Sequence, residues 1–245
     1  MNLSIAVATG GRVLWQLRRD PRTIALLLAV PCLLLVVARY MFDGQEQTFA
    51  RVGVPLLGIF PFSTMFIVTS ITMLRERTTG TLERLMTMPL AKLDILLGYA
   101  IAFGLVAAAQ AVLVAALGFG LLGLETGHSE VLVSAVAIAN GLLGMALGLF
   151  SSAFATTEFQ AVQFMPAFVL PQILLCGLLV ERSRMAAWLE TISDAMPLTY
   201  AYDALARVTR AGPLGSEFTR DSAVIAGFMV GALVLGALTL RRRTA

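Results

Sequence analysis

ILLGYAIAFGLVAAAQAVLVAALGFGLL, residues 95–122, is a run of 28 residues without a charged side chain. A helix rises about 1.5 Å per residue, so about 20 apolar residues cross the roughly 30 Å hydrocarbon core of a bilayer. A barrel strand would instead alternate apolar and polar residues over about ten positions, whereas this run is continuous. The stretch therefore predicts a membrane-spanning helix, and similar stretches lie on both sides of it.

The composition of the whole chain leads to the same conclusion. Of its 245 residues, 58% are hydrophobic and 13% are charged, and the mean hydropathy is +0.84. A water-soluble domain has about twice this share of charge and too little interior to bury so much apolar surface. Two cysteines are too few for a disulfide-stapled scaffold, and the apolar content excludes a disordered chain. We expect an integral membrane protein.

Six apolar stretches are long enough to cross the bilayer, which predicts an all-α membrane protein with one transmembrane domain over residues 1–245. Together they contain one charged side chain, Arg39, near the end of its span, where it can reach the headgroups. The six expected spans are residues 23–42, 52–74, 95–122, 131–154, 162–180 and 222–240.

The distribution of basic residues predicts the orientation of these spans. Placing both termini in the cytoplasm puts eleven basic and five acidic residues inside, and seven basic and ten acidic residues outside. The inner face is then net positive, which suits an anionic inner leaflet, and we expect a multi-pass protein of the plasma (inner) membrane. The inner basic residues are Arg12, Arg18, Arg19, Arg22, Arg75, Arg77, Arg84, Lys92, Arg241, Arg242 and Arg243.

Residues 1–22 precede the first apolar run. Leu14, Trp15 and Leu17 lie beside Arg12, Arg18 and Arg19, a pattern typical of an amphipathic helix in the inner interface. The alternative is a disordered basic tail. No small-residue cleavage site follows the first span, so we do not expect a signal peptide.

Several chemistries lack the residues that they need. A P-loop ends in Gly-Lys-Ser/Thr, but the single lysine, Lys92, is followed by Leu93, so ATP hydrolysis on this chain is not expected. His128 is the single histidine, which excludes a pair of histidine ligands, and we expect neither a metal nor a catalytic residue. The spans contain no acidic residue, which argues against coupling to a proton or sodium gradient. We expect no cofactor on this chain and no nucleic-acid partner.

Neutral polar residues do occur within the spans. They have two interpretations: they line a translocation path for an amphipathic solute, or they hydrogen-bond between helices. The candidates for the path are Ser63, Thr64, Thr69, Gln110, Asn140, Gln163 and Gln172. Small residues at four-residue spacing, Gly144 with Gly148 and Gly227 with Gly231, predict close helix packing. Pro31, Pro55, Pro61, Pro166 and Pro171 are expected to interrupt three spans, which favours a moving protein over an inert anchor.

The cytoplasmic connection at residues 75–94 is the candidate coupling site. Thr79 or Thr81 can cap a short helix whose apolar face is Leu82, Leu85 and Met86, and Pro89 ends it. Such a face suits a groove on a soluble partner; alternatively, the helix lies on the bilayer surface. The residues expected to couple to an ATPase are Glu76, Arg77, Gly80, Thr81, Leu82, Glu83, Arg84, Leu85 and Met86.

The run from Glu76 through Glu83, with Gly80-Thr81-Leu82-Glu83 at its centre, resembles the signature of type-2 ABC exporter membrane subunits of the daunorubicin-resistance kind. Downstream, residues 171–177 (PQILLCG), Trp188 and residues 196–205 (MPLTYAYDAL) resemble the fifth span and outer re-entrant helices of that family. Thr78 and Met88 differ from the residues that family members often carry at these positions.

This resemblance implies six spans, an N-terminal interfacial helix, a cytoplasmic coupling helix, and outer re-entrant helices within residues 181–221. It also implies a second copy or a paralogous permease, two separate ATPase subunits that hold ATP and Mg, contact with membrane lipids, and export of a lipophilic drug, lipid or similar solute. For residues 181–221 the alternative is a plain extracellular loop. Two other functions stay open: a membrane-embedded enzyme acting on lipid-linked substrates, and a scaffold subunit.

Overall fold

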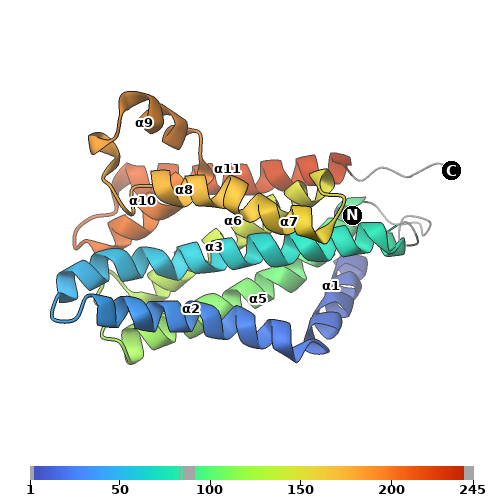
Figure 1. Ribbon diagram of the computed structural model, residues 1–245, viewed down its shortest axis with the longest axis horizontal. Coiled ribbons are helices and arrows are strands. Elements are labelled where there is room, and N and C mark those ends of the chain that lie inside the picture. The colour runs from blue at the N-terminus through green and yellow to red at the C-terminus, as the bar shows by residue number, and fades with distance from the viewer. Residues whose placement is uncertain (1–2, 83, 85–91, 240–245) are drawn as a thin grey trace.

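The computed structural model describes residues 3–82, 84 and 92–239, and these residues form helices and turns without a strand. Helices α2 (Pro21–Met41), α3 (Glu46–Thr78), α5 (Lys92–Gly120), α6 (Glu130–Ser151) and α11 (Gly215–Thr239) run along one common direction (Figure 1). Five segments in this part of the chain are long and apolar enough to cross a membrane: Pro21–Met41, Glu46–Thr78, Asp94–Gly120, Glu130–Phe154 and Gly215–Thr239. Five of the six expected spans are thus confirmed as helices of spanning length.

The expected span at residues 162–180 has a different form. It is divided into α7 (Glu158–Phe164), a π-helical turn η2 (Met165–Val169) and α8 (Leu170–Leu175), none of which is long enough to span alone. The three segments follow one another alongside α3 (Figure 1). Pro166 lies in the π turn and lacks an amide hydrogen to donate, so one backbone hydrogen bond of a regular helix is absent there.

Prolines interrupt fewer helices than the sequence predicts. Helix α2 continues through Pro31, and α3 continues through Pro55 and Pro61. The prediction of three interrupted spans is therefore wrong for these two helices. Pro31, Pro55 and Pro61 are all buried, and tertiary packing of this kind lets a helix tolerate the hydrogen bond that each proline removes.

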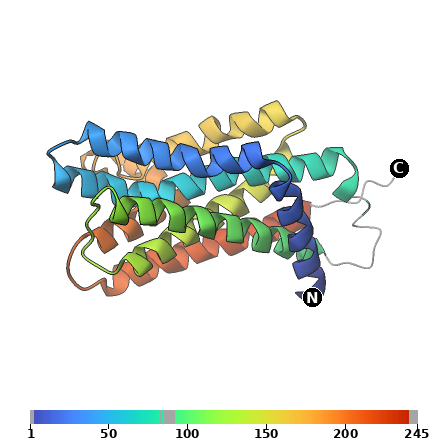
Figure 2. The ribbon, with the colours of Figure 1, turned by 90° about the horizontal axis from the view of Figure 1, so that it is seen from below.

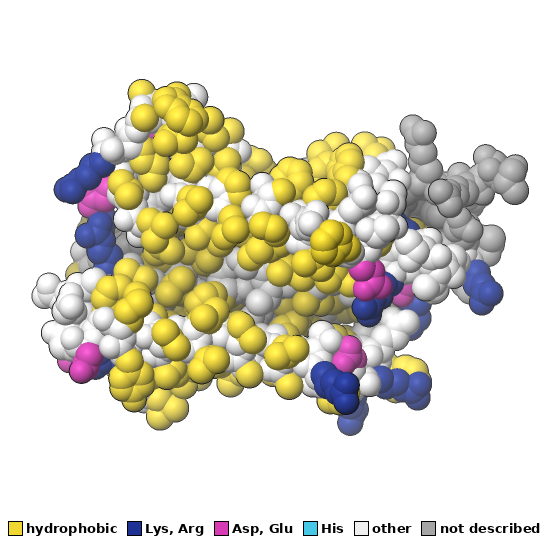
Figure 3. All heavy atoms as spheres, viewed as in Figure 1, with side chains coloured by type: hydrophobic (Ala, Val, Ile, Leu, Met, Phe, Trp, Pro, Cys, Tyr) yellow, Lys and Arg dark blue, Asp and Glu magenta, His cyan; other side chains and the backbone are white. Residues whose placement is uncertain are grey.

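The two ends of the bundle carry the charged side chains, and an apolar band lies between them (Figure 3). Helix α1 (Leu3–Arg18) crosses one end at a steep angle, and α11 finishes at the same end (Figures 1 and 2). We call this the α1 end. The opposite end, here the α10 end, carries η3 (Arg182–Arg184), α9 (Ala187–Asp194) and α10 (Pro197–Thr209). Residues 1–22 thus contain a helix, as expected, and residues 181–221 contain helices in place of a plain loop.

Helix α3 lies at the centre of the bundle. In its apolar window 61% of residues are buried, against 22% in α2 and in α11, which expose leucine and valine side chains along their outer faces. Helix α3 packs most closely on α6 at two glycines. A Cβ at Gly144 would lie 2.1 Å from the Phe62 carbonyl oxygen, and one at Gly148 would lie 2.4 Å from that of Phe66. These two helices therefore approach backbone to backbone, as the spacing of Gly144 and Gly148 predicts.

The second glycine pair, Gly227 with Gly231, does not pack against another helix in the described part of the chain. A Cβ at Gly227 or Gly231 would meet nothing within 4 Å among the described residues. Both glycines instead line an open apolar groove between α6 and α11, together with Phe150 and Phe228. The predicted packing role is therefore wrong for this pair within the single chain.

Helix α10 is buried along one side although it lies in a segment rich in charge. Leu198, Ala201, Leu205 and Val208 recur at helical spacing and are inaccessible to solvent. Helix α9 instead exposes Trp188 and Ile192 and protrudes from the bundle (Figure 1). The segment expected to be either re-entrant helices or a plain loop thus consists of one helix inserted among α3, α6 and α11 and one that is exposed.

Candidate coupling site at the α1 end

Helix α1 is fixed to α5 by small residues. Ala6, Thr9 and Val13 recur on one face of α1 and are buried. A Cβ at Gly98 of α5 would lie 2.5 Å from the Thr9 Cβ atom, and one at Gly10 would lie 3.0 Å from the Gly98 carbonyl oxygen. Because side chains are absent at both glycines, the two helices approach closely, and α1 is bound to the bundle as well as amphipathic.

A partly buried ion pair joins α1 to the end of α3. The Arg12 guanidinium lies 3.3 Å from the Glu76 carboxylate and donates a 2.9 Å hydrogen bond to the Tyr99 hydroxyl of α5. The Glu76 side chain is 7% exposed and that of Arg12 is 30% exposed. A charge-assisted hydrogen bond in such a low-dielectric position holds its partners firmly, because leaving the buried carboxylate alone is costly. Three helices therefore meet at this ion pair.

A cavity of about 460 Å³ opens beside this ion pair, between α1, the start of α2 and the end of α3. Hydroxyl, amide and carboxylate groups line part of its wall, and apolar side chains line the rest. At its rim, hydrogen bonds from the Thr23 hydroxyl and amide lower the pKa of Asp20, so this carboxylate is ionised at neutral pH. The cavity is lined by Val13, Gln16, Leu17, Asp20, Thr23, Val68, Ile71, Thr72, Arg75, Glu76, Thr79, Thr81 and Phe103.

The chain turns sharply at Gly80, directly after α3. Thr79 ends α3, and its hydroxyl donates a 2.7 Å hydrogen bond to the Arg75 carbonyl. Gly80 has φ = 73°, a left-handed conformation that favours glycine. Residues 81 and 82 are helical again, and the Arg84 amide donates to the Gly80 carbonyl at 3.1 Å. A helical turn thus begins at Thr81, where the sequence predicts the coupling helix.

The predicted docking residues differ in how far they are buried and in which helices they contact. Leu82 is 4% exposed and packs in one cluster with Val13 of α1 and Met73 of α3, whereas the side chain of Arg84 is exposed. The Arg77 guanidinium lies 3.4 Å from the Thr239 hydroxyl of α11. Glu83, Leu85 and Met86 lie outside the described residues, so the docking face itself stays a prediction.

The start of α7 is also held at the α1 end, by an ion pair with α3. Arg75 of α3 donates two hydrogen bonds, of 2.7 Å and 2.9 Å, to the Glu158 carboxylate. This fork-to-fork geometry fixes the orientation of both planar groups. Through Arg75, Glu76 and Arg77, three consecutive residues of α3 contact α7, α1 and α11.

Most of the seven candidate path residues form contacts between helices. The Gln110 amide donates to the Leu27 carbonyl of α2 at 3.1 Å and accepts from the Thr64 hydroxyl of α3 at 2.8 Å. The Thr69 hydroxyl lies 3.2 Å from the Met145 carbonyl of α6. Gln110 and Thr69 are inaccessible to solvent. The interpretation of interhelical hydrogen bonding is thus favoured for these three residues.

The other four differ among themselves. The Asn140 amide donates to the Ala201 carbonyl of α10 at 3.3 Å, and the Gln172 amide oxygen accepts from the Leu198 amide at 3.2 Å, which ties α8 to α10. Gln163 is exposed on α7. The Ser63 hydroxyl and the Asn140 amide oxygen are buried without a hydrogen-bond partner in the described part of the chain. None of the seven residues lines the cavity beside the Arg12–Glu76 ion pair.

Comparison with known proteins shows the family to which this chain belongs. Residues 7–208 match the model of the ABC-2 type transporter family, from α1 through nearly all of α10. The chain belongs to the ABC-2 type transporter family. A probable multidrug ABC transporter permease, YbhR, of Escherichia coli strain K12 is 32% identical over 139 residues, which make up 57% of this chain and 38% of that permease. The same permease of Escherichia coli O157:H7 gives identical values.

This ABC-2 chain thus matches little more than a third of the length of the curated relatives. The resemblance on the run from Glu76 to Glu83 is confirmed at the level of the family. Among the described residues no group of three or more His, Cys, Asp and Glu side chains could hold a metal ion. Arg12, Tyr99 and Glu158 were not predicted as part of the site, because their partners lie 64 to 87 positions away in sequence and no local pattern indicates them.

Replacing Gln110 with leucine in this ABC-2 protein is expected to lower stability by about 1 kcal/mol, since interhelical hydrogen bonds in membrane proteins contribute about that much. Thermal unfolding of the purified protein in detergent measures the change, and Gln163→Leu, on the exposed face of α7, is the control that should leave stability unchanged. Transport per folded molecule should stay the same in Gln110→Leu. Lost transport with an unchanged unfolding temperature would instead assign Gln110 to the path.

Proposed function

We propose that this chain is the membrane subunit of an ATP-driven exporter in the plasma (inner) membrane, with the α1 end in the cytoplasm. It is not itself catalytic. A separate ATPase subunit, which holds ATP and Mg, docks at the turn after α3, and the spans move a lipophilic drug, lipid or similar amphipathic solute outward. The family match over residues 7–208 is the observation that carries this proposal.

The geometry of the α1 end supports docking there. Residues 75–77 contact three helices, and the helical turn that follows Gly80 begins directly beside them. A force applied to this turn therefore reaches α1, α7 and α11 through side-chain contacts of the same short segment. The basic side chains at this end, including Arg18, Arg19 and Arg22, suit an anionic inner leaflet.

We further propose that α7, η2 and α8 together make the sixth crossing, and that two permease subunits, identical or paralogous, assemble with two ATPase subunits. The π turn at Met165–Val169 and the exposed Gln163 place irregular backbone and a polar amide on an outward-facing surface of this chain. Irregular backbone at membrane depth is tolerated where protein or a water-filled cavity covers it. Gln163, which is exposed, and Ser63, whose hydroxyl is buried without a hydrogen-bond partner among the described residues, are on this view the better candidates for lining the path.

The proposal is tested by extracting the protein from its native cells in mild detergent and identifying its partners. A stoichiometric soluble subunit with a P-loop is expected, and inside-out vesicles should take up a lipophilic fluorescent dye only with ATP. A six-span protein that purifies intact and alone, with no ATP-dependent uptake, would contradict the proposal.

A substitution at Gly80 tests whether the ATPase subunit binds at the turn after α3. Gly80→Val imposes a left-handed conformation on a β-branched residue at a cost of about 1–2 kcal/mol, so it should reorient the following turn and reduce co-purified ATPase at least about fivefold. Gly44→Val is the matched control: Gly44 has φ = 72°, also has open space around its Cβ position, and lies at the opposite end. An equal loss of co-purified ATPase in both variants would mean that the ATPase binds at another part of the chain.

A further inference from the structure

The divided segment from α7 to α8 is held at both ends of the bundle. Its first half, α7, lies beside the last turns of α3, and its second half, α8, lies nearer α9 and α10 (Figure 1). The π turn η2 joins the two halves. Because the halves have different partners, a movement at one end of the bundle acts on α7 and on α8 differently.

Helix α7 begins with its own capping contacts. The Thr157 hydroxyl accepts a hydrogen bond from the Gln160 amide at 3.3 Å, and the Gln160 side-chain oxygen accepts one from the Thr156 amide at 2.9 Å. This reciprocal pair is similar to a capping box, which stabilises the first turn of a helix. Glu158 lies in that turn, where the helix dipole favours a carboxylate. Helix α7 is therefore a separate helical unit and not a continuation of α6.

Two kinds of contact hold α7 on the end of α3. Arg75 donates two hydrogen bonds, of 2.7 Å and 2.9 Å, to the Glu158 carboxylate. Beside this ion pair, Leu74 and Ala161 belong to a small buried cluster that is distinct from the two larger clusters of the bundle. The rest of α7 is largely exposed, including Phe159. A helix with so narrow a buried face follows the element to which that face is attached, here the end of α3.

Helix α8 is held instead by hydrogen bonds to α9 and α10. The Gln172 side-chain oxygen accepts from the Leu198 amide at 3.2 Å, and the Ser193 hydroxyl donates to the Leu175 carbonyl at 2.9 Å. Ser193 and Leu198 are inaccessible to solvent. Buried groups that lose a hydrogen-bond partner are costly, so α8 is firmly fixed at the α10 end.

The backbone between the two halves lacks hydrogen bonds that a regular helix has. Pro166 lies within η2 and Pro171 lies at the start of α8, and neither has an amide hydrogen to donate. Sharp bends in helices occur mainly at prolines and π turns. A change of angle between α7 and α8 at η2 therefore disrupts fewer hydrogen bonds than it would in a regular helix.

We propose that Arg75 is a positioning residue that makes α7 move with the end of α3, while α8 stays on α10 and η2 serves as the hinge. The source of the movement, an ATPase docked after Gly80, rests on the proposed function. The division into a moving half and a fixed half depends on this chain alone. A displacement at the α1 end then changes the angle of α7 and the direction of its exposed Gln163.

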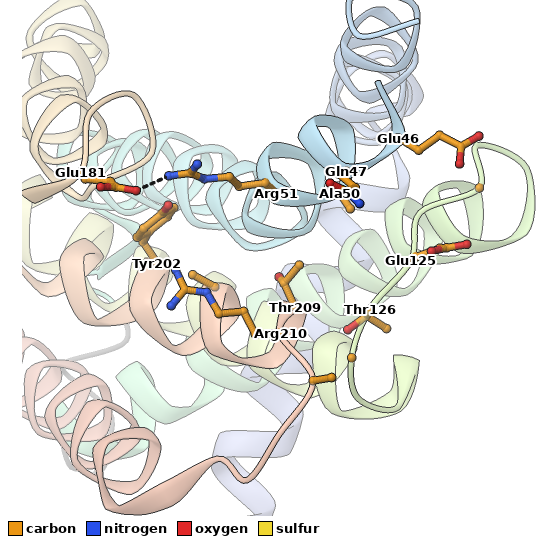
Figure 4. Close-up of a pocket in the computed structure, with 14 residues that line it drawn as sticks. Glu46, Gln47, Ala50, Arg51, Glu125, Thr126, Glu181, Tyr202, Thr209 and Arg210 are labelled. Atoms are coloured by element: carbon orange, nitrogen blue, oxygen red, sulfur yellow. Dashed lines mark hydrogen bonds and ion pairs between the residues drawn. The ribbon is translucent and has the colours of Figure 1, made fainter. Parts of the chain in front are cut away.

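Hydrogen exchange of the purified full chain in detergent, followed by mass spectrometry, tests the hinge. Arg75→Gln should speed exchange in α7 by about threefold and leave exchange in α8 unchanged, because only α7 loses a contact. Arg51→Gln is the matched control: the Arg51–Glu181 ion pair is also exposed, measures 2.8 Å, and lies at the opposite end (Figure 4). It should leave exchange in α7 unchanged. Unchanged exchange in α7 of Arg75→Gln, or an equal rise in α7 and α8, would overturn the proposal.

A charge exchange in the complex with the ATPase tests the role of Arg75 in transport. In inside-out vesicles, Arg75→Glu and Glu158→Arg should each lower dye uptake per ATP hydrolysed by at least about threefold, with the amount of bound ATPase unchanged. The double variant should restore uptake, whereas a merely structural role would change the yield of folded protein and not this ratio. Uptake that the double variant fails to restore would overturn the role of Arg75. A wild type without ATP-dependent uptake would overturn the proposed function instead, and hydrogen exchange would still decide the hinge.

Discussion

Replacing Gly144 with valine is expected to abolish the accumulation of folded protein. A Cβ at this position would lie 2.1 Å from the carbonyl oxygen of Phe62 and 2.7 Å from its carbonyl carbon. Overpacking a core with side chains that can move costs about 1–3 kcal/mol, and here the obstacle is backbone at the centre of α3, so the loss is larger. Size-exclusion chromatography of detergent extracts should show aggregate or no protein.

Gly227→Val is the matched control for this prediction. It makes the same substitution in a membrane helix at the same spacing motif, but none of the residues that the structure describes lies within 4 Å of its Cβ position. Valine also has a higher helix propensity than glycine, so the monodisperse peak should be kept. A folded Gly144→Val protein would show that α3 and α6 can separate without loss of the fold.

Replacing Arg12 with glutamine is expected to destabilise the protein by about 3 kcal/mol, the lower end of the range found when one partner of a buried ion pair is removed, because the Arg12 side chain is 30% exposed. The Glu76 carboxylate, which is 7% exposed in the wild type, would lose the one cation that lies within 4.0 Å of it among the described residues. Glu76→Gln should cost clearly less, because the Arg12 side chain is 30% exposed and can turn toward water. Thermal unfolding of the purified variants measures this asymmetry.

A double-mutant cycle separates the ion pair from other effects. Arg12→Gln combined with Glu76→Gln should be more stable than Arg12→Gln alone, since the unpaired charge is then gone. Arg18→Gln, on an exposed part of the same helix, should change stability by less than about 0.5 kcal/mol. Additive losses at Arg12 and Glu76 would mean that the two side chains do not depend on each other.

The helices could be predicted from sequence because hydropathy over a 20-residue window is a local property. Residues 23–42 and 131–154 were placed within three residues of helices α2 and α6 with its following turn. The divided segment at residues 158–175 was not predicted in its form, since proline alone does not distinguish a continuous helix from a π turn. Pro55 and Pro61 in the continuous α3 show that packing decides between the two.

The candidate site could be predicted only in part. Gly80 and Thr81 lie at the turn where sequence places them, and the same run identified the family. The direction of each side chain depends on which helices pack together, so Leu82 proved to be buried against α1 and Gln110 to bridge α2 and α3. The glycine pairs give the clearest example: Gly144 and Gly227 have the same spacing motif, and only the tertiary structure distinguishes the packed pair from the exposed one.

Helix α3 is one uninterrupted element of 33 residues, about 50 Å long, with Glu46 at one end and Glu76 near the other. If it tilts about its midpoint by about 5°, each end is displaced by about 2 Å, and the two displacements are opposite in direction. A lever of this kind links the two ends of the bundle without any chain of intermediate contacts. If a molecule at the α10 end and a second molecule at the α1 end each bind one tilt more tightly than the other, each changes the affinity of the other, and the two changes are by the same factor.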